Sequence, residues 1–408
     1  MGLAVTSKMC SVGRAVVTVT LMVDRTLVQV DREVFHALFS SSVVAGYAGV
    51  KKALEGKPLP FNDFLDLTRK AEIPYPLFFA PREVVDAQIK LKVDKLMSGF
   101  TKSSFSMNSR HRVELSDVEL IVKDLLRKQA LLRKNDDTLV ANSIVGLLKK
   151  SRQPVAADAQ RLMEAVGFTH EDIRNAKSKT AAVDLLIARL EAAQIFVSRS
   201  AQHFMPQGMP AHAKFSGITI KDKKVPFIFL ATGNEGEQLE PAGRKLFTLT
   251  LLTVLVARGT FAPVNYDGHT KDETAPREYQ LTAEILMPAS EFGDLTFDDL
   301  DAVREAAEVF RVTPSAVAMR ARRLGILGRE RFELHMDALQ AEYRQRPKQR
   351  LSSPRPVNAL RNYNGVECSR RMLAMLDTGK LSSADFRRIV FFNKIAVSKI
   401  SEFREAVG

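Results

Sequence analysis

The chain has 408 residues, and 45% of them are hydrophobic, so it is long enough for two or three domains with real cores. Its formal net charge of +13 predicts an acidic partner; the alternative is a cytoplasmic protein that is merely basic. Cys10 and Cys368 lie far apart and fit no metal-binding spacing, so we expect free thiols in a reducing compartment. These features exclude a disulfide-framed scaffold and predict a cytoplasmic protein without membrane contact.

Valine- and threonine-rich sequence after Ala15 predicts two short strands around a turn, AVVTVTLM and TLVQV. Asp31 is placed to cap a following helix, Arg32–Ser40. Residues 42–80 then resemble the second half of an XRE-type helix-turn-helix, in which a recognition helix ends in a Glu-Gly turn and a further amphipathic helix supports it. The resemblance implies a DNA-binding module.

The same segment departs from an XRE domain in two ways. Two helices should precede the recognition helix, and the chain has room for one before Ser42. The candidate recognition helix carries AGYAG from Ala45, which offers almost no hydrogen-bonding groups to base edges. Lys51 and Lys52 could contact phosphates, but such contacts read no sequence. We therefore expect residues 1–80 to be a degenerate module, a structural remnant or dimerisation surface, with specific DNA reading as the alternative.

Residues 81–192 are predicted to be helical throughout. Ser116 and Glu119 have the spacing of a capping box before a helix that runs to about Lys134. Two further helices are expected at residues 158–166 and 180–193. Basic residues alternate here with acidic ones, which indicates a solvated face, and a nucleic-acid groove is the alternative. The basic residues concerned are Arg127, Lys128, Arg133, Lys134, Lys149 and Lys150.

From Gln194 the pattern turns to strands and leads to an almost continuous apolar run, residues 246–257. That run is too short to cross a bilayer, which needs about 20 residues, and it has the length of a buried helix. Leu246 and Leu249 recur at helical spacing, while other leucines fill the opposite side. We therefore expect a helix that is apolar all round and surrounded by the rest of its domain.

Segments on both sides of this helix follow a recognisable order. FSGITI from Phe215 and VPFIFL from Val225 read as a strand pair, RKLFTL from Arg244 leads into the helix, and AEILMP from Ala283 follows it. This order resembles the metallopeptidase domain of the ImmA/IrrE family, whose helix carries His-Glu-x-x-His. In that motif two histidines bind zinc and the glutamate acts as base. The resemblance implies a zincin-like domain with a small sheet at residues 193–342.

The metal-binding motif itself is missing. Counted from Phe247-Thr-Leu, the first histidine falls on Leu251, the glutamate on Leu252 and the second histidine on Leu255. Leucine neither binds a metal nor transfers a proton. We therefore predict a peptidase-like domain without catalytic residues, without a cofactor and without a metal.

Other acidic residues and histidines give weaker alternatives. Glu273 or Glu278 could supply an acidic ligand, but one carboxylate without imidazoles does not hold zinc. His203 and His212 flank a loop with two prolines and have no acidic or cysteine neighbours, so we expect surface roles. A rebuilt site is the remaining alternative, and it would use His269, Asp272 and Glu273.

The C-terminal third begins with a predicted helix pair, residues 296–310 and 313–325, which resembles the pair that closes the family's domain. Its second helix carries three arginines that could contact phosphate or simply form its solvated side: Arg320, Arg322 and Arg323. A proline-rich basic linker is expected at residues 343–364 and a helical tail at residues 365–408. Candidate contacts of the linker with nucleic acid or an acidic protein are Arg344, Arg346, Lys348, Arg350 and Arg355.

The predicted fold class is α+β and mostly helical, with the zincin-like domain between helical regions. The predicted function is non-enzymatic: a regulatory or scaffold protein on a metal-less ImmA/IrrE-like fold that binds a partner protein, with DNA and a second copy of the chain as further candidate partners. The resemblance implies a repressor, an antitoxin or a phage-defence component. The alternatives are a zinc-dependent endopeptidase with a displaced site and a basic structural or assembly protein.

Overall fold

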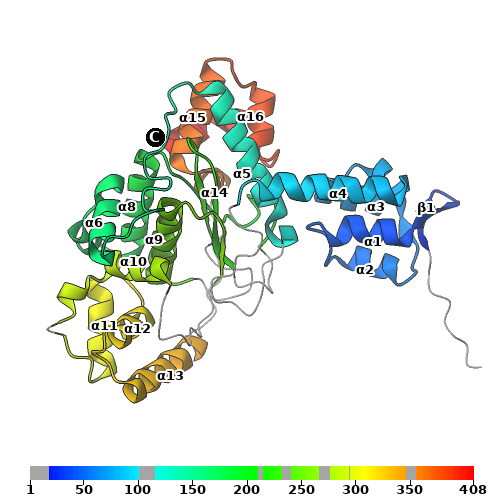
Figure 1. Cartoon of the computed structure of the whole chain (residues 1–408). Coiled ribbons are helices and arrows are strands. Elements are labelled where there is room, and N and C mark those ends of the chain that lie inside the picture. Colours follow the sequence, from blue (N-terminus) through cyan, green and yellow to red (C-terminus); the bar gives the residue numbers. More distant parts are fainter. Residues whose placement is uncertain are drawn as a thin grey trace, which may run out of the picture. The chain divides into compact units, whose positions relative to one another are not determined.

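The computed structural model describes residues 18–100, 115–209, 215–231, 240–265, 276–293, 295–345 and 355–408. These residues are mostly helical and form two small sheets, which agrees with the predicted α+β, mostly helical class (Figure 1). The chain divides into two compact units, Met1–Asp94 and Lys95–Gly408. Among the helices of the described residues, none combines the length and the apolar character that crossing a membrane requires.

Unit 1 contains a three-stranded sheet of order β2-β1-β3, with β1 (Thr18–Val23) antiparallel to β2 (Thr26–Asp31) and parallel to β3 (Leu59–Pro60). The predicted strand pair is therefore confirmed, whereas β3 was not predicted. Asp31 caps the next helix as expected, because its Oδ1 accepts hydrogen bonds from the backbone N–H groups of Glu33 (2.7 Å) and Val34 (2.9 Å). The helices of this unit are α1 (Arg32–Ser40), α2 (Ala48–Leu54), α3 (Phe61–Ala71), the 3-10 helix η1 (Tyr75–Phe79) and most of α4 (Arg82–Met97).

The predicted recognition helix is shorter in the structure. It begins at Ala48, while the preceding residues from Ser42 form consecutive turns, held by bonds such as Ala45 N–H to the Ser42 carbonyl. From Thr18 onward, where the description begins, one helix, α1, precedes it, in agreement with the prediction. Edge-to-face contacts join Phe35, Phe39 and their aromatic neighbours, and aliphatic side chains complete the core of this small unit.

Unit 2 is organised on a four-stranded mixed sheet of order β4-β6-β5-β7. β4 (Phe196–Arg199) runs parallel to β6 (Phe227–Leu230), and β5 (Phe215–Ile220) is antiparallel to β6 and to β7 (Pro263–Asn265). Alternate residues of β6 face two different cores: Phe227 and Phe229 belong to one apolar cluster, Ile228 and Leu230 to the other. The sheet is therefore covered on both faces, which explains its nearly continuous apolar strands.

Two groups of helices cover this sheet, and Figure 1 shows them on opposite sides of it. One group contains α6 (Val155–Val166), α8 (Lys179–Ala192), α9 (Ala242–Arg258) and α10 (Arg277–Leu286). The other contains α5 (Leu115–Asn135), α14 (Pro356–Asn364), α15 (Val366–Asp377) and α17 (Ile400–Val407). The C-terminal helices, predicted as a tail, thus share a core with β4, β5 and β6.

Two expectations about the helical middle are wrong. α5 begins at Leu115, so Ser116 lies inside its first turn and is not its N-cap. Residues 136–154 contain no helix. Asp136 ends the helical run because its Oδ1 binds Thr138 N–H (3.0 Å) and Thr138 Oγ1 (2.6 Å), which favours a turn.

Shorter elements complete unit 2. Thr313 caps α12 and Gly325 follows it with φ +76°, as the proline and glycine signals predicted. The remaining elements are α7 (His170–Arg174), η2 (Ala289–Glu291), α11 (Leu300–Val309), α12 (Pro314–Arg323), α13 (Arg329–Gln345), α16 (Ser383–Ile389) and η3 (Val397–Lys399).

Candidate functional site

The helix that would carry a metal motif, α9, lies in the centre of the larger core of unit 2. Its three leucines at the motif positions are buried: Leu251 is 2% exposed, and Leu252 and Leu255 are 0% exposed. They belong to the same apolar cluster as residues of α6, α8, α10 and β6. The prediction of a helix surrounded by its domain is confirmed, and the three leucines contribute to the packing of its core.

Strand β5 packs closely against α9. A Cβ on Gly217 of β5 would lie 2.7 Å from Leu252 Cδ1 and 2.7 Å from the Phe229 carbonyl, so strand and helix touch at a glycine. Three threonines of α9 are buried, and two of them satisfy their hydroxyls inside the helix, Thr250 with the Leu246 carbonyl and Thr253 with the Leu249 carbonyl, both at 2.9 Å. These two hydroxyls therefore need no partner from outside the helix.

The acidic residues near α9 are engaged in ion pairs. Glu278 of α10 lies 3.4 Å from Nε of Arg258, at the end of α9. Glu284 accepts a hydrogen bond from Arg320 of α12, whose Nε also donates to the Met287 carbonyl at 3.1 Å. Arg320 is 8% exposed, so it joins α12 to the Leu-Met-Pro segment and cannot contact phosphate. This corrects its assignment as a surface contact.

The other predicted contacts differ in accessibility. Lys51 and Lys52 are exposed in the last turn of α2, and Arg344 and Arg355 are exposed at the ends of α13 and α14. Arg322 and Arg323 are half-buried on α12, and burial lowers the pKa of Arg323. Three linker residues lie outside the described residues: Arg346, Lys348 and Arg350.

Histidines and further acidic residues were the alternative metal ligands. Within the described ranges, no group of three or more His, Cys, Asp or Glu side chains is arranged to hold a metal ion. His203 is described, with φ +63° and its carbonyl accepting from Lys394. The remaining candidates, His212, His269, Asp272 and Glu273, lie outside the described residues.

Sequence reasoning missed a buried carboxylate beside the sheet. Glu191 of α8 is 7% exposed, and its Oε1 has no hydrogen-bond partner. Its Oε2 accepts a long bond, 3.3 Å, from the backbone N–H of Glu367, and the backbone N–H of Val197 is the second donor that favours the charged form. Burial, and the charge of Glu367, raise the pKa of Glu191 from 4.5 to about 7. Nothing in the helical pattern distinguishes Glu191 from a solvated residue at the end of a helix.

A second missed feature is a buried ion pair on α5. Lys128 is fully buried, and its Nζ donates to Asp124 Oδ2 at 2.6 Å, where Tyr363 Oη also donates at 2.9 Å. The ammonium lies over the rings of Tyr363 (4.8 Å) and Phe392 (5.0 Å). Burial raises the pKa of Asp124, although Lys128 opposes that effect. These contacts of Asp124 and Lys128 connect α5 to the C-terminal helices. From the sequence, the i,i+4 spacing of the two residues indicates an ion pair on a solvated face.

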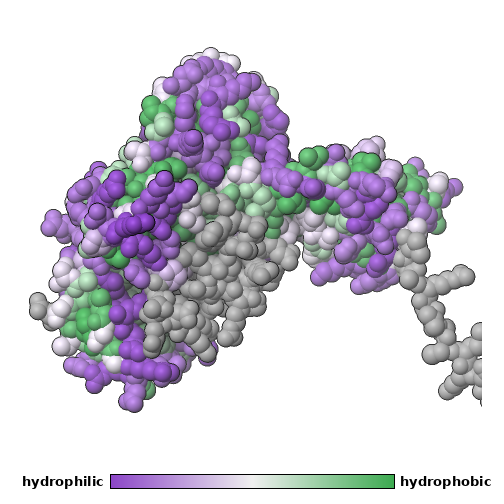
Figure 2. Space-filling view, viewed as in Figure 1, coloured by the Kyte–Doolittle hydropathy of each residue, from purple (hydrophilic) through white to green (hydrophobic). Residues whose placement is uncertain are grey.

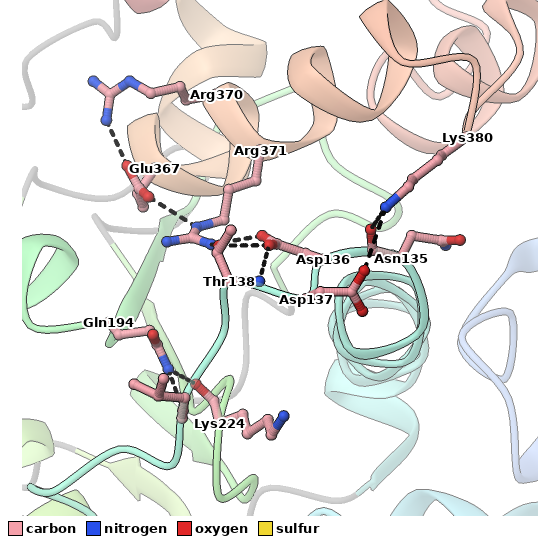
Figure 3. Close-up of polar contacts among 11 residues, drawn as sticks. Asn135, Asp136, Asp137, Thr138, Gln194, Lys224, Glu367, Arg370, Arg371 and Lys380 are labelled. Atoms are coloured by element: carbon pink, nitrogen blue, oxygen red, sulfur yellow. Dashed lines mark hydrogen bonds and ion pairs between the residues drawn. The ribbon is translucent and has the colours of Figure 1, made fainter.

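Polar contacts at the end of α5 tie the same elements together (Figure 3). Arg371 of α15 donates to Glu367 (2.8 Å) and to Asp136 (2.5 Å). Lys380 Nζ donates to the Asn135 carbonyl at 2.7 Å. Burial raises the pKa of Asp136, but hydrogen bonds from Thr138 and Arg371 outweigh this effect and lower the pKa overall. These contacts hold the turn after α5 against α15.

Hydrophilic residues cover much of the described surface over α15 and α16 and over α6 and α8 (Figure 2).

Comparisons with protein-family models, with curated proteins and with solved structures find no match to this chain.

Proposed function

We propose that this chain is a non-enzymatic regulatory or scaffold protein, built on an ImmA/IrrE-like fold that has lost its metal centre, and that it acts by binding a partner protein, with DNA as a further candidate partner. The observation that carries the proposal is the burial of Leu251, Leu252 and Leu255. At the positions where the resembling family binds zinc and activates water, this chain places three side chains that stabilise a core.

The order of segments around α9 supports the family assignment, which remains a proposal. A hairpin (β5 and β6) precedes the helix, and α10 with its Leu-Met-Pro follows it. The exposed arginines at the ends of α13 and α14, Arg344 and Arg355, support an acidic partner. Together these features favour a binding protein of the repressor, antitoxin or phage-defence kind, acting in the cytoplasm.

Metal analysis of the purified full-length chain, together with a peptidase assay with and without EDTA, tests the scaffold assignment. We expect less than stoichiometric metal and no hydrolysis that EDTA abolishes. Stoichiometric zinc with EDTA-sensitive hydrolysis would establish the alternative, a peptidase with a displaced site.

Co-purification at low and at high salt tests the binding assignment. We expect a partner that is retained at low salt and released at high salt, because exposed charges are screened. A double substitution, Arg344→Glu with Arg355→Glu, should weaken retention, whereas Lys177→Glu with Arg189→Glu, an equal change of net charge elsewhere on unit 2, should not. Equal loss in both pairs would show that only overall charge matters.

A further inference from the structure

A cluster of lysines surrounds the turn between β5 and β6. The turn reads Lys221-Asp222-Lys223-Lys224, and its three lysines are exposed. Asp222 is 9% exposed: its Oδ1 accepts the backbone N–H groups of Lys224 (2.7 Å) and Val225 (2.9 Å), and its Oδ2 pairs with Arg133 at 3.0 Å. The Asp222 carboxylate therefore binds the backbone of the turn and Arg133, and it forms no ion pair with the three exposed lysines.

Neighbouring segments add lysines to the same surface. Lys134 is exposed beside Arg133 at the end of α5. The Lys223 carbonyl accepts the Asn142 N–H at 2.7 Å, and Gln194 Nε2 donates to the Lys224 and Val140 carbonyls, each at 2.7 Å. In Figure 3 the Lys224 side chain extends away from these contacts. The irregular segment after α5 thus lies directly against the lysine turn.

The same irregular segment soon reaches two more exposed lysines, Lys149 and Lys150. Their position is fixed, because Gly146 N–H and Leu148 N–H donate to carbonyls in the last turns of α9, at 3.1 Å and 2.8 Å. We call the resulting set the lysine surface; it comprises Lys134, Lys149, Lys150, Lys221, Lys223 and Lys224.

Acidic residues along this segment are mostly withdrawn from solvent. Asp136 pairs with Arg371 at 2.5 Å. Asp158 is 0% exposed and binds Ser151 Oγ and Arg277, each at 2.5 Å. Asp137 stays exposed, 3.7 Å from Lys380. Throughout the part of the chain that the structure covers, no ion pair involves any of the six ammonium groups, so their positive charge is not cancelled locally.

The chemistry of this surface favours a phosphate backbone over a protein. Protein–protein interfaces are depleted of lysine and use aromatic and arginine side chains at their centres, whereas exposed lysines outnumber the exposed arginines, Arg133 and Arg152, along these segments. Lysine contacts phosphate as a flexible point charge without reading bases. For Lys134, Lys149 and Lys150 the sequence predicts a solvated face, because acidic residues alternate with basic ones there, and the structure shows that Asp136 is engaged by Arg371.

We propose that the lysine surface binds the phosphate backbone of nucleic acid without sequence preference. The proposal extends the proposed function, which leaves the DNA contact open, and it assigns that contact to residues of unit 2 instead of Lys51 and Lys52 of unit 1. It can fail while the metal-less scaffold stands, since metal content and nucleic-acid affinity are measured separately.

Fluorescence anisotropy of a labelled DNA duplex of about 20 base pairs, titrated with the full chain at about 50 and 200 mM NaCl, tests the proposal. Lys223→Gln with Lys224→Gln should lower the affinity at least about tenfold at the lower salt and reduce the slope of log K against log salt by about two. Lys149→Gln with Lys150→Gln should act in the same direction. The matched control is Lys177→Gln with Arg189→Gln, which removes two exposed charges near and on α8 and should leave the slope unchanged.

Four results would overturn the proposal. The first is that the unaltered chain does not bind the duplex, and the second is that the control pair weakens duplex binding as much as the lysine pairs do. The third is that only Lys51→Gln with Lys52→Gln weakens duplex binding. The fourth is that poly-glutamate displaces the labelled duplex more strongly than unlabelled duplex does. Thermal melts of each variant check that the fold is retained, so that a loss of affinity can be attributed to the lost contact between lysine and phosphate.

Discussion

Replacing Glu191 by glutamine should make unit 2 more stable at alkaline pH. The carboxylate is buried between α8, β4 and the start of α15, where Oε1 has no partner and Glu367 adds a second negative charge. Arg199 attracts the charge only weakly, so the ionised form is disfavoured in the folded chain. The carboxyl group should therefore be protonated at moderately acidic pH and carry an unfavourable charge above neutrality.

The sign and the size follow from the pKa of Glu191, which burial raises from 4.5 to about 7. Because the folded chain holds this proton more tightly than the unfolded chain, the stabilisation is complete below pH 4.5 and is lost as the pH rises through 7. The difference corresponds to about 3 kcal/mol. Glutamine removes the titration, but its amide group next to two backbone N–H donors costs about 1 kcal/mol. We expect a net gain of about 2 kcal/mol at alkaline pH.

Urea unfolding from mildly acidic to mildly alkaline pH measures this effect. The difference in unfolding free energy between Glu191→Gln and the unaltered chain should rise with pH. Glu164→Gln is the matched control for the loss of one carboxylate, because Glu164 is exposed on α6. A constant difference between Glu191→Gln and the unaltered chain across this range would refute the assignment of a raised pKa to Glu191.

Three further substitutions test the packing. Leu255→His should lower the unfolding free energy by at least about 3 kcal/mol, because a core side chain is lost and the ring nitrogens are left unpaired. The control is Leu334→His on the exposed side of α13, which should change the unfolding free energy by under about 0.5 kcal/mol. Equal melting temperatures of the two variants would contradict burial of α9. Gly365→Ala should lower the unfolding free energy measured in urea by about 2 kcal/mol or more, because the new Cβ would lie 2.6 Å from Glu191 Oε1 and from the Val197 carbonyl oxygen. Gly379→Ala is the control: the new Cβ would meet no neighbouring atom, so only the backbone strain at φ +70° remains, and the loss should be about 1 kcal/mol. Lys128→Met should cost about 3 to 5 kcal/mol by the same measurement, because it leaves the buried Asp124 carboxylate without its ammonium partner and with the Tyr363 hydroxyl alone as donor, and a neutral result would mean that the pair is not desolvated.

Local signals predicted much of the fold because they act within a few residues. Asp31 and Thr313 cap helices where the sequence placed them, and the apolar run predicted the buried helix α9. Each depends on hydrogen bonds or periodicity inside one segment. The strands β3 and β7 could not be read in this way, since each is very short and exists through pairing with a strand distant in sequence.

Long-range contacts decided the residues that the sequence placed incorrectly. Arg320 reads as one of three arginines on a solvated helix side, yet it is buried because α10 presents Glu284 and the Met287 carbonyl to it. Lys128 reads as a surface partner of Asp124, yet Tyr363 and Phe392 cover it. In both cases the partner is more than thirty residues away, so no window along the helix reveals the burial.

Charge is redistributed by the same long-range contacts, and this bears on what the surface can bind. A count along the chain treats Asp222 and Asp158 as neutralising the lysines beside them. The structure instead uses both carboxylates internally, in the β5–β6 turn and against Arg277. Conversely, the cation of Arg320 is withdrawn from α12, which was one of several candidate phosphate contacts. Because an interior charge is screened from a polyanion by its own partner, the lysine surface should attract nucleic acid more strongly than α12.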